Sequence, residues 1–275
     1  MPVPRRTRSA APQGSAVINV MRNAALKASK GLLRDFGELE SLQVSQKGPA
    51  DFVTAADVRV EQILRSELEH ARPGYCFQME ESGRIDGPDK THCWHIDPID
   101  GTTNFMHGIP NFCISIALER ESQLVAAVIY APVLNELFWA EKGTGAFLNE
   151  KRLRVAARKS LPDAVIATGI PVANWPGQDQ FMAELSAMMK SVAGIRRFGS
   201  AALDLAYVAA GRFDGFWERN LKTWDIAAGT LLVREAGGLV TDEKGAGEVL
   251  SSQAVIAANF DLHPQMLKLL ANAKA

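Results

Sequence analysis

The chain has 275 residues, of which 47% are hydrophobic and 22% are charged, a composition typical of a soluble globular protein. Its 30 Lys and Arg residues against 31 Asp and Glu residues give a formal net charge of −1. That balance gives no electrostatic reason to expect a nucleic acid or an anionic membrane as the main partner. The longest apolar run, 125–133, is far shorter than the roughly 20 residues that a membrane helix needs.

Residues 1–15 are rich in Pro, Arg, Ser and Ala and are predicted to form a flexible basic tail. Arg5 and Arg6 are adjacent, but no apolar segment follows them, so a twin-arginine signal is not expected. The cytoplasm is therefore the expected location.

The cysteine content supports the same location. Cys76, Cys93 and Cys113 form no close pair in the sequence and no C-x-x-C motif. An odd count without such a framework argues against disulfide bonds and against a cysteine zinc site, and it favours a reducing compartment.

In the first half of the chain, helical spacing of apolar residues predicts a helix from Ala16 to about Glu38. A loop, Ser45–Asp51, follows it, and Thr54 is placed to cap a second helix over 55–71. The strands expected after these helices are short, and the last three form a meander: Tyr75–Met79, Trp94–Ile99, Phe112–Leu118, Leu124–Ala131 and Glu136–Glu141.

In the last third of the chain, helices and strands alternate more evenly. Strands are expected at Ile195–Phe198, Gly215–Glu218, Gly238–Thr241 and Ala254–Ala258. Helices are expected at Phe181–Val192, Ala201–Ala210, Ile226–Ala236 and Pro264–Ala273. The pattern predicts an α+β fold in one domain, 16–275, with an antiparallel sheet in the half 16–158 and a mixed sheet in the half 159–275.

Residues 97–105 read DPIDGTTNF and follow an apolar strand. Pro98 favours extended backbone at Asp97, so a tight turn could bring the carboxylates of Asp97 and Asp100 and the carbonyl of Ile99 around one point. Hard divalent cations prefer such oxygen ligands. The small residues that follow suit a helix N-terminus, whose free N–H groups bind phosphate. A solvated turn with a capping aspartate would have the same sequence, and both interpretations stay open here.

Three other segments allow a structural and a functional interpretation. Asp225 stands where a helix begins, which by itself indicates an N-cap. Residues 199–202 open another helix with small side chains, which by themselves indicate close packing. Glu80 and Glu81 end a short strand, and their repulsion would be relieved by a cation or by solvent.

Together these segments resemble the inositol monophosphatase family, and bacterial members in particular. The two signatures of that family are matched at 97–105 and at 224–238, which begins WDIAAG and ends EAGG. Its other landmarks follow in the expected order, at 47–57, 80–82 and 199–204. The likeness runs from about Val17 to the C-terminus. It implies a layered αβαβα sandwich, a lithium-sensitive homodimer, and Mg²⁺-dependent hydrolysis of inositol monophosphate by a metal-activated water.

The resemblance also implies a set of metal ligands for two or three Mg²⁺ ions per site. Glu80, Asp97 and the carbonyl of Ile99 would hold the first ion. Asp97, Asp100 and Asp225 would hold the second, and Glu80 would also serve a third, weak site.

Further residues would serve catalysis and substrate binding. Thr102, together with Asp57, would orient and activate the attacking water. Backbone groups of Gly101 and Thr102 would hold the phosphate, and Glu218 would accept hydrogen bonds from a polyol hydroxyl. The substrate pocket would be lined by one helix start: Gly199, Ser200 and Ala201.

The sequence departs from the family pattern at several places that bear on substrate choice. Met79 precedes Glu80 where many relatives have a small residue, and the segment between Glu80 and Asp97 is short. Arg219 and Asn220 follow Glu218, where they could alter the rim of the pocket.

Metal-assisted hydrolysis needs no covalent nucleophile, and the sequence offers no clear one. It contains no G-x-S-x-G elbow and no cysteine followed by a phosphate-cradling loop. A strand would place His92 and His95 on opposite faces, so both are expected to be structural, and His107 is assigned no chemistry.

Two alternatives stay open. Within the same superfamily, the substrate could be fructose 1,6-bisphosphate, histidinol phosphate or 3′-phosphoadenosine 5′-phosphate, although the carboxylate of Glu218 favours a polyol over a second phosphate. A different class of function is a regulatory scaffold that binds RNA or an acidic protein through basic residues. The candidates are Arg5, Arg6, Arg8, Arg196 and Arg197.

Overall fold

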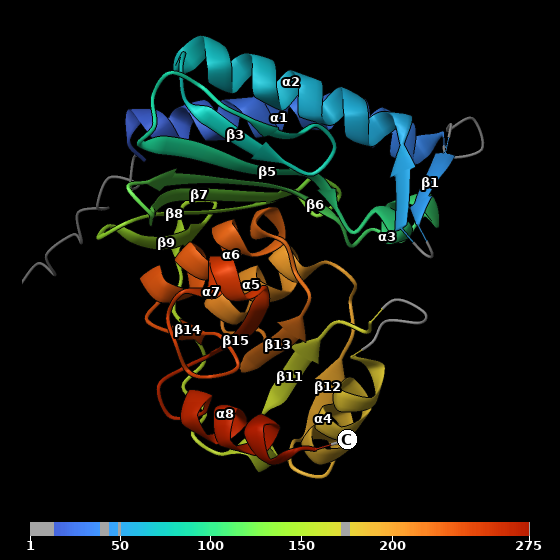
Figure 1. Cartoon of the computed structure of the whole chain (residues 1–275), viewed down its shortest axis with the longest axis vertical. Helices are drawn as coiled ribbons and strands as arrows, with labels where there is room; N and C mark the ends of the chain where they lie inside the picture. Colours follow the sequence, from blue (N-terminus) through green and yellow to red (C-terminus); the bar gives the residue numbers. More distant parts are fainter. Residues whose placement is uncertain (1–13, 39–43, 49–50, 172–176, 275) are drawn as a thin grey trace, which may run out of the picture.

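The computed structural model describes residues 14–38, 44–48, 51–171 and 177–274 (Figure 1). The predicted tail lies outside the described residues, apart from Gly14 and Ser15. Among the described residues, no helix combines the length and the apolar character needed to cross a membrane.

The two N-terminal helices are confirmed. Helix α1 spans Ala16–Gly37, and Ser15 caps it by accepting a hydrogen bond from the N–H of Ile18 at 3.4 Å. Helix α2 spans Ala55–Ala71 and begins with a capping box, in which Thr54 and Asp57 bond to each other's backbone N–H groups. The expected loop between the helices is wrong in part, because strands β1 (Val44–Gly48) and β2 (Asp51–Thr54) pair there as an antiparallel hairpin.

The larger sheet has eight strands in the order β10-β9-β8-β7-β6-β5-β3-β4. All its neighbouring strands are antiparallel except β3 and β5, which run parallel. The strands are β3 (Cys76–Met79), β4 (Gly83–Ile85), β5 (His92–Asp100), β6 (Cys113–Arg120), β7 (Gln123–Ala131), β8 (Glu136–Glu141), β9 (Gly145–Leu148) and β10 (Lys151–Arg152). The meander after residue 110 is therefore confirmed, and β4, β9 and β10 are additional.

The smaller sheet is mixed, as expected, and has the order β12-β11-β13-β15-β14. Its strands are β11 (Val165–Thr168), β12 (Gly194–Arg196), β13 (Gly215–Arg219), β14 (Leu239–Thr241) and β15 (Ala254–Ala258). The helices after residue 100 are α3 (Thr102–Met106), α4 (Gln178–Met189), α5 (Ala201–Ala209), α6 (Thr223–Glu235), α7 (Val249–Ser252) and α8 (His263–Asn272).

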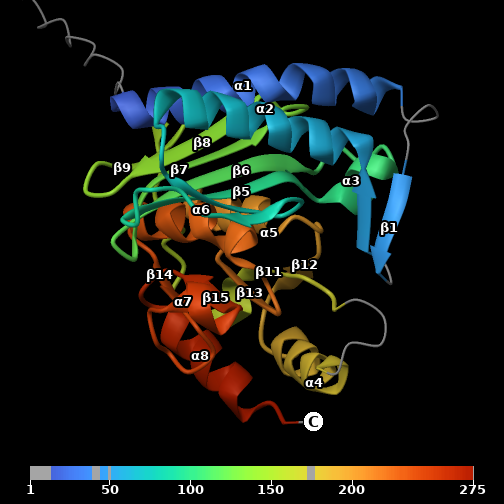
Figure 2. The ribbon, with the colours of Figure 1, turned by 45° about the horizontal axis from the view of Figure 1, so that its top comes forward.

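The sheets and the main helices form five layers (Figures 1 and 2). Helices α1 and α2 cover one face of the larger sheet, α5 and α6 lie between the two sheets, and α4 and α8 cover the far face of the smaller sheet. This is the expected layered αβαβα sandwich. Small residues allow the two central helices to pack closely, since a Cβ on Gly229 of α6 would come within 2.4 Å of the Cβ of Leu205 in α5.

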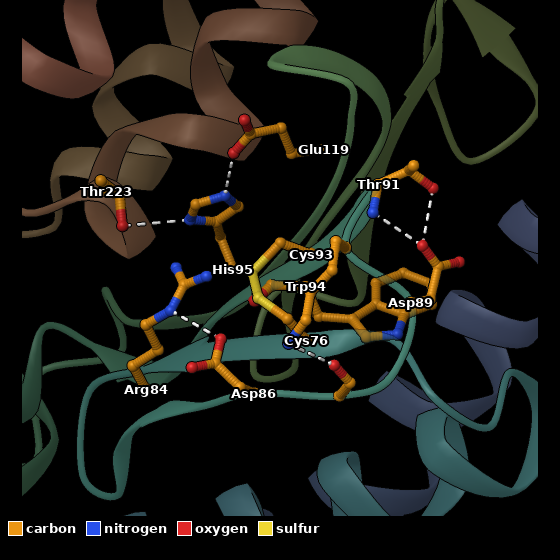
Figure 3. The surroundings of a disulfide bond; sticks show 12 residues. Cys76, Arg84, Asp86, Asp89, Thr91, Cys93, Trp94, His95, Glu119 and Thr223 are labelled. Atoms are coloured by element: carbon orange, nitrogen blue, oxygen red, sulfur yellow. Dashed lines mark hydrogen bonds and ion pairs between the residues drawn. A yellow bond between two sulfur atoms is a disulfide. The ribbon is translucent and has the colours of Figure 1, made fainter.

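A disulfide bond joins Cys76 and Cys93, so the expectation of unpaired cysteines is wrong for these two (Figure 3). The parallel pairing of β3 and β5 places them directly opposite each other, with Cα atoms 4.4 Å apart and 17 positions apart in the chain. Sequence spacing could not reveal this register. The cysteine argument for a reducing compartment loses its premise, because disulfide bonds are typical of oxidising ones. Cys113 is free and buried.

Candidate active site

A β-bulge at the end of β5 brings Asp97 and Asp100 towards the same side of the sheet. Asp97 pairs with Ser115 of β6 and Asp100 pairs with Cys113, so three steps along β5 match two steps along β6. In a regular strand, residues three apart point to opposite faces, and one extra residue reverses the second of them. The expected tight turn around Pro98 is thus a bulge within the strand, with the same consequence for the two carboxylates.

Asp97 is the most confined of these carboxylates, with 2% of its surface exposed. Its Oδ1 accepts a hydrogen bond from the N–H of Ile99 at 2.9 Å. Burial raises the pKa of Asp97 well above its usual value, and the neighbouring charges of Glu80, Asp100 and Asp225 raise it further. Because each of these charges acts on Asp97, the four carboxylates predicted as metal ligands lie together.

Asp100 is held by the start of helix α5. Its Oδ2 accepts hydrogen bonds from the hydroxyl of Ser200 at 2.6 Å and from the N–H of Ala202 at 2.7 Å. Burial raises the pKa of Asp100 to about 6, although these hydrogen bonds oppose the shift. The sequence assigned Ser200 and Ala201 to the substrate pocket, and in the structure this helix start also orients Asp100.

Asp225 lies in the first turn of α6 and is not its N-cap, a position that Lys222 occupies. Its Oδ2 accepts a hydrogen bond from the N–H of Lys222 at 2.6 Å, which completes half of a capping box. Burial, followed by the charge of Asp100, raises the pKa of Asp225 to about 8. The helix begins at Thr223, three residues before the expected start, and this fixes the carboxylate at the helix end that faces the aspartates of β5.

A buried histidine anchors the start of α6 to the larger sheet (Figure 3). The Nδ1 of His95 lies 3.0 Å from the Oγ1 of Thr223, and its Nε2 lies 2.7 Å from a carboxylate oxygen of Glu119. The hydroxyl of Ser115 also donates to the carbonyl of Trp224 at 3.3 Å. The structural role expected for His95 agrees with these contacts, and they position Asp225 relative to β5. The sequence could not identify these partners, which are up to 128 positions apart.

Glu80 follows directly after β3, and its N–H donates to the carbonyl of Ile96 at 3.2 Å, which continues the pairing with β5. The turn after it is held by Glu61 of α2, which accepts hydrogen bonds from the N–H groups of Glu81 and Ser82 at 2.8 and 2.9 Å. Sequence reasoning missed Glu61. A signal existed, because a glutamate one helical turn after Asp57 lies on the buried face of α2.

Thr102 and Asp57 are neighbours, as the resemblance implied. The Oγ1 of Thr102 lies 3.3 Å from the Oδ1 of Asp57 and 3.0 Å from the carbonyl of Ile99. Asp57 is fully buried, and burial raises its pKa although hydrogen bonds from Thr54 oppose the shift. A hydroxyl has one proton to donate, so Thr102 can serve only one of its two acceptors at a time.

The substrate side of the site is built around glycines. Gly101 and Gly199 both have positive φ, at 100° and 81°, and a Cβ on Gly101 would lie 3.2 Å from the carbonyl of Gly199. The side-chain amide of Asn104 joins the two loops, because it donates to the carbonyls of Asn111 and Phe198 at 2.7 Å each. Asn104 was part of the recognised motif but had no assigned role.

Glu218 reaches the site from β13 in the smaller sheet. A Cβ on Gly169 would fall 1.8 Å from its Oε1, so the carboxylate lies against the bare backbone of that glycine. Burial and the charge of Asp100 raise the pKa of Glu218 to about 8, and Arg197 opposes the shift. Sequence reasoning missed Gly169 because nothing near it in the chain marks it as a partner of residue 218.

The donor chemistry of the carboxylate cluster fits a hard divalent cation. Its members offer oxygen atoms only, which is the ligand type that Mg²⁺ prefers, and their raised pKa values mean that their ionised forms are destabilised in the absence of a cation. Within the part of the chain that the structure describes, no three His, Cys, Asp or Glu side chains are arranged to hold a metal ion as they stand. Like charges repel, so we expect these carboxylates to turn towards one point only when a cation lies between them.

The sequence and the fold both have known relatives. Residues 14–275 match the inositol monophosphatase family. The inositol-1-monophosphatase of Caulobacter vibrioides is 57% identical over 253 residues, which cover 91% of this chain and 99% of that protein. The crystal structure of extragenic suppressor protein suhB from Bartonella henselae is 54% identical, has a TM-score of 0.92 and matches 94% of this chain and 100% of that one. The Nus factor SuhB of Vibrio cholerae is 44% identical over 243 residues, or 88% of this chain and 91% of that protein.

Proposed function

Because the chain belongs to the inositol monophosphatase family and is a phosphoric monoester hydrolase, we propose that it hydrolyses myo-inositol monophosphate with the help of Mg²⁺. The observation that carries this proposal is the cluster of Glu80, Asp97, Asp100 and Asp225, in which Asp97 and Asp100 are buried and the charges of the other three residues raise the pKa of Asp97. Such a cluster is costly unless a cation compensates it.

We assign the first ion to Glu80, Asp97 and the carbonyl of Ile99, and the second to Asp97, Asp100 and Asp225. Bound Mg²⁺ would neutralise phosphate charge and make a nearby water more acidic. The existing hydrogen bonds support this assignment. They engage Oδ1 of Asp97 and Oδ2 of Asp100 and of Asp225, which restrains each carboxylate and leaves its other oxygen for a metal ion.

Thr102 and Asp57 would position the attacking water. The hydroxyl oxygen of Thr102 can accept a hydrogen bond from water while its own proton is donated to the carboxylate of Asp57. When the water attacks phosphorus, its proton would pass to Thr102 as the proton of Thr102 moves to Asp57. The bond between phosphorus and the inositol oxygen would break, and that oxygen would take a proton from solvent. The raised pKa of the buried Asp57 makes this carboxylate a better proton acceptor.

The substrate would lie between the two sheets. Backbone N–H groups at Gly101 and Thr102 would hold the phosphate, and the helix start at Gly199, Ser200 and Ala201 would line the pocket. Glu218 would accept hydrogen bonds from the polyol hydroxyls, which requires its ionised form. The charge of Asp100 helps to raise the pKa of Glu218. A cation that neutralised Asp100 would therefore favour the ionised form of Glu218.

The carboxylate of Glu218 favours inositol monophosphate over the other family substrates. A second phosphate on fructose 1,6-bisphosphate or 3′-phosphoadenosine 5′-phosphate would be repelled if it lay near that carboxylate. Histidinol phosphate offers fewer hydroxyl groups. The homodimer, lithium inhibition and cytoplasmic location implied by the family belong to the same proposal.

A second candidate function is a regulatory one, which the relatives named Nus factor SuhB favour. RNA binding that depends on salt and survives Asp100→Asn would support such a role. It would be compatible with hydrolysis, because it uses the surface and leaves the carboxylate cluster unchanged.

The experiment is phosphate release from myo-inositol 1-phosphate and from the three alternative substrates, each with Mg²⁺ and with excess chelator. We expect kcat/KM to be highest for myo-inositol 1-phosphate and chelator to abolish release. A higher kcat/KM for a bisphosphate would contradict the proposed substrate, and full activity in chelator would contradict the metal.

A further inference from the structure

The end of strand β13 presents two neighbouring charges to opposite faces of the smaller sheet. Trp217 packs in the core beneath the sheet with Phe181 of α4, so alternation sends Glu218 to the upper face and Arg219 to the lower one. Glu218 accordingly interacts with Asp100 and Asp204 on the active-site side. Figure 1 shows α4 on the opposite side of this sheet.

On the lower face, Arg219 forms an ion pair with Glu184 of α4. Its Nε and Nη2 donate to the Oε1 of Glu184 at 3.0 and 2.7 Å. The same oxygen accepts a hydrogen bond from the side chain of Gln180 at 2.9 Å, and Glu184 is fully buried. A charge-assisted contact of this kind inside the protein holds the guanidinium in one place.

The ion pair and Glu218 line one small cavity. Its walls also include Gly169 and Trp217, and it leaves about 10 Å³ for the centre of a water molecule. The carboxylate of Glu218 is also confined by Gly169, because its Oε1 lies where a Cβ of that residue would be. Without Glu184, Arg219 would still share this cavity with the carboxylate of its neighbour, Glu218.

We propose that Glu184 is a positioning residue for substrate selection: it holds Arg219 on α4 and so keeps the carboxylate of Glu218 free for substrate hydroxyl groups. This inference rests on the proposed function and extends it. A guanidinium that paired with Glu218 would occupy the acceptor that a polyol needs. The reacting phosphate, which lies at the aspartates, would be unaffected.

The test compares Arg219→Met and Glu184→Gln with Arg158→Met. Arg158 is a matched control, since it pairs at 3.0 Å with the buried carboxylate of Asp214, just before the other end of β13. Each enzyme is assayed with myo-inositol 1-phosphate and with p-nitrophenyl phosphate, which has no sugar hydroxyls. Thermal unfolding is measured for all variants.

We expect Glu184→Gln to raise KM for myo-inositol 1-phosphate about tenfold, with kcat changed less than about twofold and KM for p-nitrophenyl phosphate unchanged. Arg219→Met removes the guanidinium that would pair with Glu218 and should leave both KM values unchanged. Adding Arg219→Met to Glu184→Gln should restore the wild-type KM, and Arg158→Met should leave both substrates unaffected. An equal loss on both substrates, or no loss, would overturn the positioning role. If the wild type hydrolyses p-nitrophenyl phosphate alone, the proposed substrate itself fails and the inference fails with it.

Discussion

At the scale of single residues, the candidate site depends on carboxylates that perform two different tasks. Asp97 and Asp100 are buried and Asp225 is half-buried beside them, so their negative charge is costly until a cation or a proton compensates it. Asp57 lies apart from them and contacts the hydroxyl of Thr102, which suits proton transfer. One segment, 97–105, supplies Asp97, Asp100 and Thr102, and the bulge in β5 turns its two aspartates to the same side of the sheet.

Replacing Thr102 with Ala should lower kcat about 100-fold, because a positioned proton relay contributes about that much or more. Thr102→Ser keeps the hydroxyl and should retain most of the activity. Steady-state kinetics of the two variants, with thermal unfolding as the control for folding, provide the comparison. If Ala and Ser reduce kcat equally, the hydroxyl has no part in the reaction.

Sequence reasoning found the residues whose chemistry is visible locally, and the structure places them together. Glu80, Asp97, Asp100 and Asp225 belong to recognisable motifs. It missed Glu61, Gly169 and the partners of His95, because their roles exist only through contacts between distant segments. The need for a glycine at position 169 becomes evident only in the structure, where the side chain of Glu218 lies against its backbone.

At the scale of elements, two neighbouring strands of the larger sheet lead into proposed metal ligands. Cys76 and Cys93 lie four residues before Glu80 and Asp97, on paired strands β3 and β5. The disulfide bond therefore links the strands that lead into these two carboxylates. β3 has only four residues and so forms few hydrogen bonds with β5. The disulfide bond strengthens this short pairing.

Replacing both cysteines with Ser should lower the free energy of unfolding by about 3 kcal/mol, the value for closing a loop of this length. Urea denaturation without reductant measures the change. Wild-type protein treated with dithiothreitol is the control and should lose the same amount. Three titratable thiols in the unfolded, untreated protein would show that the bond is not formed.

Local patterns predicted most elements, and the errors have physical causes. Helix α6 begins earlier than expected because contacts of Thr223 and Trp224 with the larger sheet hold its first turn. The hairpin of β1 and β2 was missed because its polar sequence lacks the alternation typical of a half-buried strand. The disulfide bond was missed because strand register is not encoded in spacing between cysteines.

At the scale of the whole molecule, the site draws on every inner layer of the sandwich. The larger sheet supplies Asp97 and Asp100, the central helices supply Asp225 and the Ser200 that orients Asp100, and the smaller sheet supplies Glu218. The family resemblance predicted this layered architecture, and composition or periodicity alone gave only the α+β class. Folding therefore brings the negatively charged side chains of these layers close together in the candidate site.

This gathering makes stability depend on pH in a predictable direction. The folded-state pKa values of Asp97, Asp100 and Asp225 are raised, to about 6 for Asp100 and about 8 for Asp225, against about 4 in an unfolded chain. At these carboxylates the folded protein thus binds more protons than the unfolded chain. Their contribution to metal-free stability is fully present below about pH 4 and is lost as pH rises through the folded pKa values. A cation that binds the ionised carboxylates should reverse this loss.

The most direct test of the proposed metal site is the thermal midpoint Tm between pH 5 and pH 8, with chelator and with Mg²⁺, for the wild type and Asp225→Asn. In chelator, the wild-type Tm should fall as pH rises, and the Tm of the variant should fall less because it lacks one of the clustered charges. Mg²⁺ should raise the wild-type Tm by an amount that grows with pH, and the variant should gain much less. A wild-type Tm that does not fall in chelator, or an equal gain from Mg²⁺ in both proteins, would contradict a cation site at these carboxylates.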